Sequence, residues 1–352
     1  MAAPVHRRRR RRRRLARTIA VAAVVAGGAI AAGLSWTGGG TDEAPHRAGS
    51  TTTAPVPSTT TTTAPPLGAD GTYPVGTTRL TVSEAGGRSL PTTVWFPAVG
   101  VAGGPDRAKA PYPLIVFSQG YDEPVTGYEA LLVDWASAGF VVAGPTYPRT
   151  DPSDPAGVDE NDIVHHPADL RAVISTLLAD GAGSGSVLAG LVDPNRVGVT
   201  GQSDGGDVSL AVAVGSCCID GRVKAAAILS GAELAAFGGG YFGGRPVPML
   251  VVQGTADDIN PPGCSAQIYD AAPAPKYGLV LLGAGHLPPY VEAGSVRQTV
   301  AAVTTDFFDA ELAGQQAGLA AMASAGAVPG VSQFTTAPTG PWPPGPCPGA
   351  PG

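Results

Sequence analysis

Charged side chains are scarce in this chain: Asp, Glu, Lys and Arg make up 14% of its 352 residues, and only three residues are lysines. The first 40 positions contain no acidic residue and nine of the 22 Lys and Arg. The rest of the chain therefore has 13 basic and 28 acidic side chains, a formal net charge of −15. A body this acidic disfavours a polyanionic partner such as DNA, so we expect no nucleic-acid partner and a neutral or cationic substrate.

The N-terminal residues 1–17 form a basic region that contains eight consecutive arginines and Arg17. Residues 18–40 carry no charge and consist largely of Ala, Val, Ile and Gly. A basic region before an apolar stretch predicts an export signal or an N-terminal membrane anchor, and both readings stay open. The positive-inside rule explains the arginines better than a nucleic-acid-binding tail does. Either reading places the remainder in the cell envelope or outside the cell, with membrane contact only through this segment.

Cysteine is also rare, and the four residues show no C-x-x-C spacing and no histidine close in sequence, so we expect no zinc site. An even number in an exported chain predicts two disulfides, for which three pairings exist. Because a bond between adjacent residues is strained, we favour Cys217 and Cys218 each pairing with one of Cys264 and Cys347. One bridge would then tie residues 217–218 to the loop that holds Cys264.

Two further segments differ in composition from the middle of the chain. Residues 41–67 are dominated by Thr, Ala and Pro, which predicts an extended linker that cannot bury a core. Residues 326–352 are rich in Pro and Gly, and we expect this tail to be held by Cys347 rather than by packing. The folded domain is therefore expected over residues 68–325.

Within that domain, short apolar runs alternate with segments whose apolar residues recur at helical spacing. The expected strands cover residues 79–82, 92–96, 114–117, 140–143, 196–200, 225–229, 248–252 and 278–282. The expected helices cover residues 128–135, 167–178, 208–214 and 300–312. This alternation predicts an α/β fold with a mostly parallel central sheet and helices on both faces. Functional sites in such sheets form at the carboxyl ends of the strands.

The pentapeptide Gly201-Gln202-Ser203-Asp204-Gly205 lies between an expected strand and an expected helix. A G-x-S-x-G motif in this context is typical of a nucleophile elbow. The two glycines allow a tight turn, so that Ser203 stands at its tip. A serine hydroxyl is a poor nucleophile without an adjacent base, so the motif needs partners downstream.

Candidate partners follow the later strands in the order Ser, acid, His. Of the five histidines only His286 follows Ser203, in a glycine-rich loop after the strand at 278–282. Asp257 and Asp258 follow the strand at 248–252, and either could orient the imidazole. This order predicts a Ser-His-Asp triad in which His286 is the base.

Other polar residues near these strands are expected to support the triad or to have a structural role. The backbone N–H groups of Asp204 and Tyr121 are the expected oxyanion-hole donors, and we expect the Tyr121 ring to line an acyl pocket. The carboxylates of Asp204 and Asp207 suit the N-terminal dipole of the helix that follows. His165 and His166 are adjacent and have no carboxylate cluster at a fixed spacing, so we expect no metal site.

Several stretches together resemble the α/β-hydrolase fold, and in particular its dienelactone-hydrolase-like branch, which holds chlorophyllases, platelet-activating-factor-acetylhydrolase-like enzymes and cutinase-like polyester hydrolases. The matching stretches are Arg88–Pro97, Tyr112–Tyr121, the elbow, Gly254–Pro261 and Gly285-His286, within residues 70–315. The G-x-x-D-x-x-x-P spacing of related hydrolases selects Asp257 as the acid and leaves Asp258 as a turn or cap residue. Gln119 departs from the pattern where a histidine is common, and Ser203 replaces the cysteine of dienelactone hydrolases proper.

The sequence as a whole predicts an exported serine hydrolase that cleaves carboxylic esters through an acyl-enzyme and uses no cofactor. The substrate would be a small-molecule, lipid or polymeric ester, and the lack of a long insertion between the strands favours an open site and bulky esters. Two alternatives are an amidase or peptidase with the same triad and a non-catalytic cell-envelope binding module with the same fold.

Overall fold

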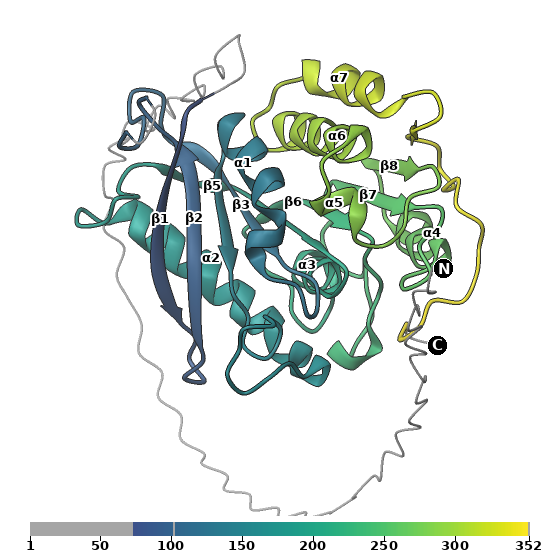
Figure 1. Cartoon of the computed structure of the whole chain (residues 1–352), viewed down its shortest axis with the longest axis horizontal. Coiled ribbons are helices and arrows are strands. Elements are labelled where there is room, and N and C mark those ends of the chain that lie inside the picture. The colour runs from purple at the N-terminus through teal and green to yellow at the C-terminus, as the bar shows by residue number, and fades with distance from the viewer. Residues whose placement is uncertain (1–72, 101–102, 351–352) are drawn as a thin grey trace, which may run out of the picture. The chain divides into compact units, whose positions relative to one another are not determined.

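A computed structural model describes residues 73–100 and 103–350 of the chain (Figure 1). The expected basic region, export segment and linker, residues 1–67, lie outside the described residues. Among the helices of the described part, none combines the length and the hydropathy that a bilayer crossing requires.

One nine-stranded sheet forms the centre of the described part of the chain, in the order β1-β2-β4-β3-β5-β6-β7-β8-β9. Strands β4, β3, β5, β6, β7 and β8 are mutually parallel. The pairs β1–β2, β2–β4 and β8–β9 are antiparallel. The strands are β1 (Val75–Ser83), β2 (Ser89–Pro97), β3 (Tyr112–Ser118), β4 (Val141–Pro145), β5 (Val192–Gln202), β6 (Val223–Leu229), β7 (Met249–Gly254), β8 (Lys276–Leu281) and β9 (Ser332–Thr335). The expected mostly parallel sheet is confirmed.

The central strands are apolar throughout because both faces of the sheet are covered. In β3, Leu114 and Val116 join the buried cluster on one face, whereas Ile115 and Phe117 join the cluster on the other. This alternation follows from the two-residue repeat of a strand. It explains why the sequence shows short continuous apolar runs instead of an alternation of apolar and polar residues.

Helices pack on both faces of the sheet, as the sequence predicts (Figure 1). One face is covered by α2 (His166–Ala182), α3 (Asp204–Val214) and α4 (Pro262–Ala271). The other is covered by α1 (Glu129–Ser137), α5 (Pro288–Val291), α6 (Ser295–Glu311) and α7 (Ala317–Gly326). The strand order and the two helical layers make this an α/β fold compatible with the α/β-hydrolase fold.

The C-terminal tail is held both by Cys347, which is bonded to Cys264, and by packing against the domain, so only the expected lack of packing is wrong. Strand β9 pairs with β8 and extends the sheet beyond residue 325. Farther along, Trp342 is only 3% exposed and its ring meets that of Tyr269 edge to face. A four-residue strand in a Pro/Gly-rich context carries too weak a pattern to be recognised from sequence.

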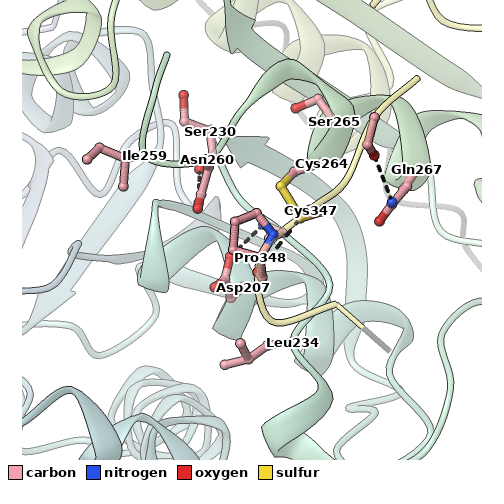
Figure 2. The surroundings of a disulfide bond; sticks show 12 residues. Asp207, Ser230, Leu234, Ile259, Asn260, Cys264, Ser265, Gln267, Cys347 and Pro348 are labelled. Atoms are coloured by element: carbon pink, nitrogen blue, oxygen red, sulfur yellow. Dashed lines mark hydrogen bonds between the residues drawn. A yellow bond between two sulfur atoms is a disulfide. The ribbon is translucent and has the colours of Figure 1, made fainter. Parts of the chain in front are cut away.

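The disulfide pairing also differs from the expected one. The bonds join Cys217 to Cys218 and Cys264 to Cys347, and Figure 2 shows the second. Helix α3 starts at the carboxyl end of β5 and runs back along the sheet, so Cys217 and Cys218 lie at the opposite edge from the loop after β7. Cys264 lies in the first turn of α4 rather than in a loop, with its Cα 4.7 Å from that of Cys347.

Candidate active site

The elbow between β5 and α3 holds Ser203 in a conformation that few serines adopt. Its φ and ψ are 56° and −125°, the strained geometry expected of a nucleophile at the tip of a sharp turn. A Cβ on Gly205 would lie 2.0 Å from the carbonyl oxygen of Ser118, and one on Gly201 would lie 2.2 Å from the carbonyl oxygen of Gly205. Both glycines are therefore required by close backbone packing.

Three predicted site residues form one hydrogen-bonded row. The Nε2 atom of His286 lies 2.8 Å from Ser203 Oγ, and its Nδ1 atom lies 2.8 Å from Asp257 Oδ2. Of the two candidate acids, Asp257 is buried and bonded to the imidazole, whereas Asp258 is exposed. The structure thus brings Ser203, His286 and Asp257 together, and their catalytic roles stay a prediction.

The carboxylate of Asp257 is held from several directions. Its Oδ1 atom accepts hydrogen bonds of 3.0 Å from the backbone N–H groups of Ile259 and Asn260. Its Oδ2 atom accepts one of 3.0 Å from Nε2 of Gln253, a fully buried side chain on β7. These donors leave the second lone pair of Oδ2 for His286, so the acid loop presents one oxygen to the imidazole in a fixed direction.

A second set of polar side chains holds the histidine loop. Gln202 Nε2 donates to the backbone oxygen of His286 over 3.1 Å, and Gln202 Oε1 accepts from the Tyr128 hydroxyl over 2.8 Å. The same hydroxyl accepts a longer bond from the backbone N–H of Gly120. Burial raises the pKa of Tyr128 far above its ordinary value, so the hydroxyl stays a neutral donor. Sequence reasoning missed Gln202 and Tyr128, although a polar residue at the end of a buried strand is a usable signal.

The two expected oxyanion donors belong to segments that abut the elbow. Asp204 follows Ser203 directly, and Tyr121 lies in the loop after β3. A Cβ on Gly120 would lie 2.6 Å from Gln202 Oε1, so that loop packs against the elbow. Within the described ranges, neither the Asp204 nor the Tyr121 N–H donates to a protein acceptor. Two unused N–H groups at these positions are what an oxyanion hole requires, and this role stays a prediction.

The side chain of Asp204 has an unusual electrostatic environment. Burial raises its pKa to about 7, the nearby carboxylate of Glu160 adds to the increase, and His286 opposes it. Its Oδ2 atom is buried and has no hydrogen-bond partner in the described part of the chain. Asp204 does lie in the first turn of α3, but burial outweighs the benefit expected from the helix dipole.

Asp207 in the same turn has a structural contact that the sequence did not suggest. Its Oδ1 atom accepts a hydrogen bond of 2.6 Å from the backbone N–H of Ala232, in the segment that follows β6. Burial raises the pKa of this carboxyl well above its ordinary value. Asp207 therefore anchors the loop after β6 to the start of α3.

The segment before α2 supplies acidic neighbours to the side chain of Tyr121. Tyr121 is half-buried, and burial raises the pKa of its hydroxyl, with further contributions from the carboxylates of Glu160, Asp122 and Asp159. His166 is buried at the start of α2 and stacks on the Tyr147 ring at 4.5 Å between centroids.

In residues 73–100 and 103–350, no group of three or more His, Cys, Asp or Glu side chains could hold a metal ion.

Two comparisons with known proteins found no match for this chain. No protein-family model matches it, and no curated protein matches it. The case for a function therefore rests on the fold and on the geometry around Ser203.

Proposed function

We propose that this chain is an exported serine hydrolase that cleaves carboxylic esters through an acyl-enzyme intermediate. The observation that carries the proposal is the row in which His286 lies 2.8 Å from both Ser203 Oγ and Asp257 Oδ2. This row stands at the carboxyl edge of a mostly parallel sheet, with the strained serine at the tip of a glycine-flanked turn. A nucleophile, a base and an orienting acid in this arrangement support acyl transfer.

The proposed reaction has two halves. Ser203 Oγ attacks the ester carbonyl while His286 Nε2 takes its proton, and the backbone N–H groups of Tyr121 and Asp204 stabilise the oxyanion. The imidazolium then gives that proton to the departing alcohol, which leaves the acyl group on Ser203. A water molecule, deprotonated by His286, attacks the acyl-enzyme, and the imidazolium returns that proton to Ser203 Oγ as the acyl–oxygen bond breaks, which releases the acid and free Ser203. Asp257 holds the Nδ1–H tautomer throughout and stabilises the imidazolium.

The proposed substrate class is bulky or polymeric esters. Because His286 protonates the leaving oxygen, the alcohol portion would lie on the side of the histidine loop. A cavity of about 370 Å³ flanks that loop and is lined by residues 283–285, 288–289 and 292–297. We place the chain in the dienelactone-hydrolase-like branch, beside chlorophyllase-like and cutinase-like enzymes, on the elbow, acid-loop and histidine-loop stretches. Ser203 in place of a cysteine argues against dienelactone hydrolysis itself.

The proposed location is the cell envelope or the extracellular space. The arginine-rich start and the uncharged residues 18–40 support export. Two disulfides in the described part of the chain fit an oxidising compartment. These observations agree with an enzyme that meets its ester substrate outside the cytoplasm.

Labelling and a substrate panel together test the proposal. A fluorophosphonate probe should label the protein, and peptide mapping should place the label on Ser203. The enzyme should hydrolyse p-nitrophenyl esters and leave the matching p-nitroanilides intact. Cleavage of anilides alone would make the protein an amidase, and a chain that resists labelling and hydrolyses neither would be a binding module.

A further inference from the structure

The last residues of the described chain run across the start of α4, next to the acid loop (Figure 2). Cys347 is bonded to Cys264 in the first turn of that helix. A Cβ on Gly263 would lie 2.7 Å from the carbonyl oxygen of Gly345, so the two backbones touch. Gln267 Nε2 also donates to that carbonyl oxygen over 3.3 Å. The C-terminal segment, residues 345–350, is therefore fixed to the N-terminal half of α4 by a covalent bond and by direct backbone contact.

The same segment also contacts the loop after β6. The backbone N–H of Ala235 donates to the carbonyl oxygen of Gly349 over 2.7 Å, and Gly349 packs on the side chain of Leu234. This loop is anchored to the start of α3 by the bond between Ala232 and Asp207. Figure 2 shows Leu234, Asp207 and the disulfide around the segment. The C-terminal segment thus connects α4 to the structure beneath the nucleophile elbow.

Two buried side chains lead from the disulfide to Asp257. Ser265, the neighbour of Cys264 on α4, donates from its Oγ atom to Gln253 Oε1 over 2.8 Å. Gln253 Nε2 then donates to Asp257 Oδ2 over 3.0 Å, the same oxygen that receives the His286 hydrogen bond. Ser265 and Gln253 are both fully buried, so no water can replace a lost partner without a rearrangement.

We propose that the C-terminal segment, through the Cys264–Cys347 bond, is a positioning element for Asp257. The inference rests on the proposed function, because it assigns Asp257 the role of orienting His286. Without the bond, the first turn of α4 loses its covalent anchor and Ser265 no longer fixes Gln253 Oε1. The Gln253 amide then keeps only its N–H bonds to Asp257 and to the carbonyl oxygens of Gly254 and Asn260. The carboxylate then samples orientations in which Oδ2 does not face the imidazole, and the imidazolium that forms in the reaction is less well stabilised.

The chain offers a matched control, since its other disulfide lies at the far end of α3 and has no contact with Gln253 or Asp257. We would compare the full-length Cys264→Ser/Cys347→Ser variant with the Cys217→Ser/Cys218→Ser variant. For each, kcat is divided by the number of Ser203 residues labelled by a fluorophosphonate once labelling is complete. The end point, unlike the labelling rate, removes the effect of a smaller folded fraction without hiding a slower Ser203. The expected result is a kcat at least about tenfold lower for the first variant, with KM little changed, and a kcat within about twofold of the unmodified protein for the second.

A second readout does not depend on turnover. Proton NMR detects the far-downfield resonance of a histidine Nδ1–H bonded to a carboxylate, here the bond between His286 and Asp257. This resonance should broaden or vanish in Cys264→Ser/Cys347→Ser and persist in Cys217→Ser/Cys218→Ser. If the unmodified protein hydrolyses no ester but its resonance responds to the Cys264–Cys347 bond, the proposed function fails and the positioning role stands.

A single variant on α4 decides the case if loss of the disulfide prevents folding. Ser265→Ala keeps both disulfides and removes only the hydroxyl that donates to Gln253 Oε1. It should lower kcat per labelled site several-fold and weaken the same NMR resonance. The inference is overturned if Cys264→Ser/Cys347→Ser keeps both the kcat and the NMR resonance of the control variant. If that variant does not fold, the same result with Ser265→Ala overturns the inference.

Discussion

Gly205 packs against the carbonyl group of Ser118 so closely that a Cβ at position 205 would lie 2.0 Å from its oxygen. Ser118 ends β3 and precedes the loop of Tyr121, and Gly205 lies in the first turn of α3. The Oγ atom of Ser118 is also bonded to the buried Tyr147 hydroxyl over 2.9 Å, which fixes its position. The elbow and the proposed oxyanion loop are therefore positioned by one shared backbone contact.

Replacing Gly205 by Ala should disturb both segments at once. A methyl group cannot fit against Ser118, so we expect the free energy of unfolding to fall by about 1–3 kcal/mol. Ester hydrolysis per folded molecule should fall by a factor of about ten or more, because the oxyanion donors move relative to Ser203. Chemical denaturation and p-nitrophenyl ester assays measure the two effects. Gly185→Ala is the control, since a Cβ there has no atom within 4 Å; equal activity per folded molecule in the two variants would refute the prediction.

The two adjacent acids should respond very differently to the same substitution. Asp257→Asn removes the acceptor of the His286 Nδ1–H, and loss of this role in a serine hydrolase lowers kcat by about 10⁴-fold. Asp258→Asn alters an exposed carboxylate and should leave kcat within about twofold. Steady-state kinetics with a short p-nitrophenyl ester measures both. A large loss with Asp258→Asn and a small one with Asp257→Asn would reverse the assignment.

The ion pairs of Arg88 should contribute far more to the free energy of unfolding than ion pairs at the surface do. Its guanidinium bonds to Asp162 and to the fully buried Asp169, with N–O distances of 2.6–3.0 Å. Arg88→Met leaves the carboxylates of Asp162 and Asp169 with only the His166 imidazole beside them, and we expect a loss of about 3–5 kcal/mol in the free energy of unfolding. The matched change Arg149→Met breaks a more exposed pair with Asp159 and should lower the free energy of unfolding far less. Urea denaturation curves of equal midpoint for the two variants would contradict this ranking.

The carboxyl group of Asp204 should impose a pH dependence on the stability of the protein and on its proposed ester hydrolysis. Its pKa in the folded protein is about 7, above the ordinary value, so the neutral form is favoured by folding. The contribution of the neutral carboxyl to the free energy of unfolding is fully present below about pH 4 and is lost as the pH rises through about 7. Ionisation also puts a buried negative charge on the residue next to Ser203, where the proposed oxyanion develops, so kcat should fall over the same range.

Asp204→Asn tests this dependence, because it keeps the backbone N–H and removes the charge. The ratio of its kcat to that of the unmodified enzyme should rise several-fold between about pH 5 and about pH 9. Glu160, His286, Tyr128 and Asp207 also face this carboxyl, so the comparison is made with all four unchanged. A ratio that stays constant with pH would show that Asp204 does not control the alkaline side of the profile.

The elements that the sequence predicts well are those with a strong local signal. The buried parallel strands appear as short apolar runs because both faces of the sheet are covered, and β3 is the clearest case. The elbow glycines are recognisable because only glycine tolerates the contact with Ser118. The order of Ser203, Asp257 and His286 follows from their places after successive parallel strands, whose carboxyl ends meet at one edge.

The features that the sequence does not predict depend on contacts between distant segments. Gln253 and Ser265 lie next to apolar residues, and nothing local indicates that they meet each other and Asp257. The pairing of Cys264 with Cys347 depends on the path of the tail after β9. The buried side chain of Trp342 fixes that path. The strain of a bond between adjacent residues argues against Cys217–Cys218 at the level of sequence, but in the fold Cys264 is bonded to Cys347 and the adjacent pair is left to each other.

The most direct test of the account is the hydrolysis of a short p-nitrophenyl ester by the unmodified protein and by Ser203→Ala. The substitution removes one oxygen atom, and circular dichroism and thermal unfolding check that the fold is kept. We predict a measurable turnover for the unmodified protein and a loss of about 10⁴-fold or more for Ser203→Ala, down to the residual catalysis that binding and the oxyanion donors provide. Full activity in the folded Ser203→Ala variant would contradict the central claim that Ser203 is the nucleophile.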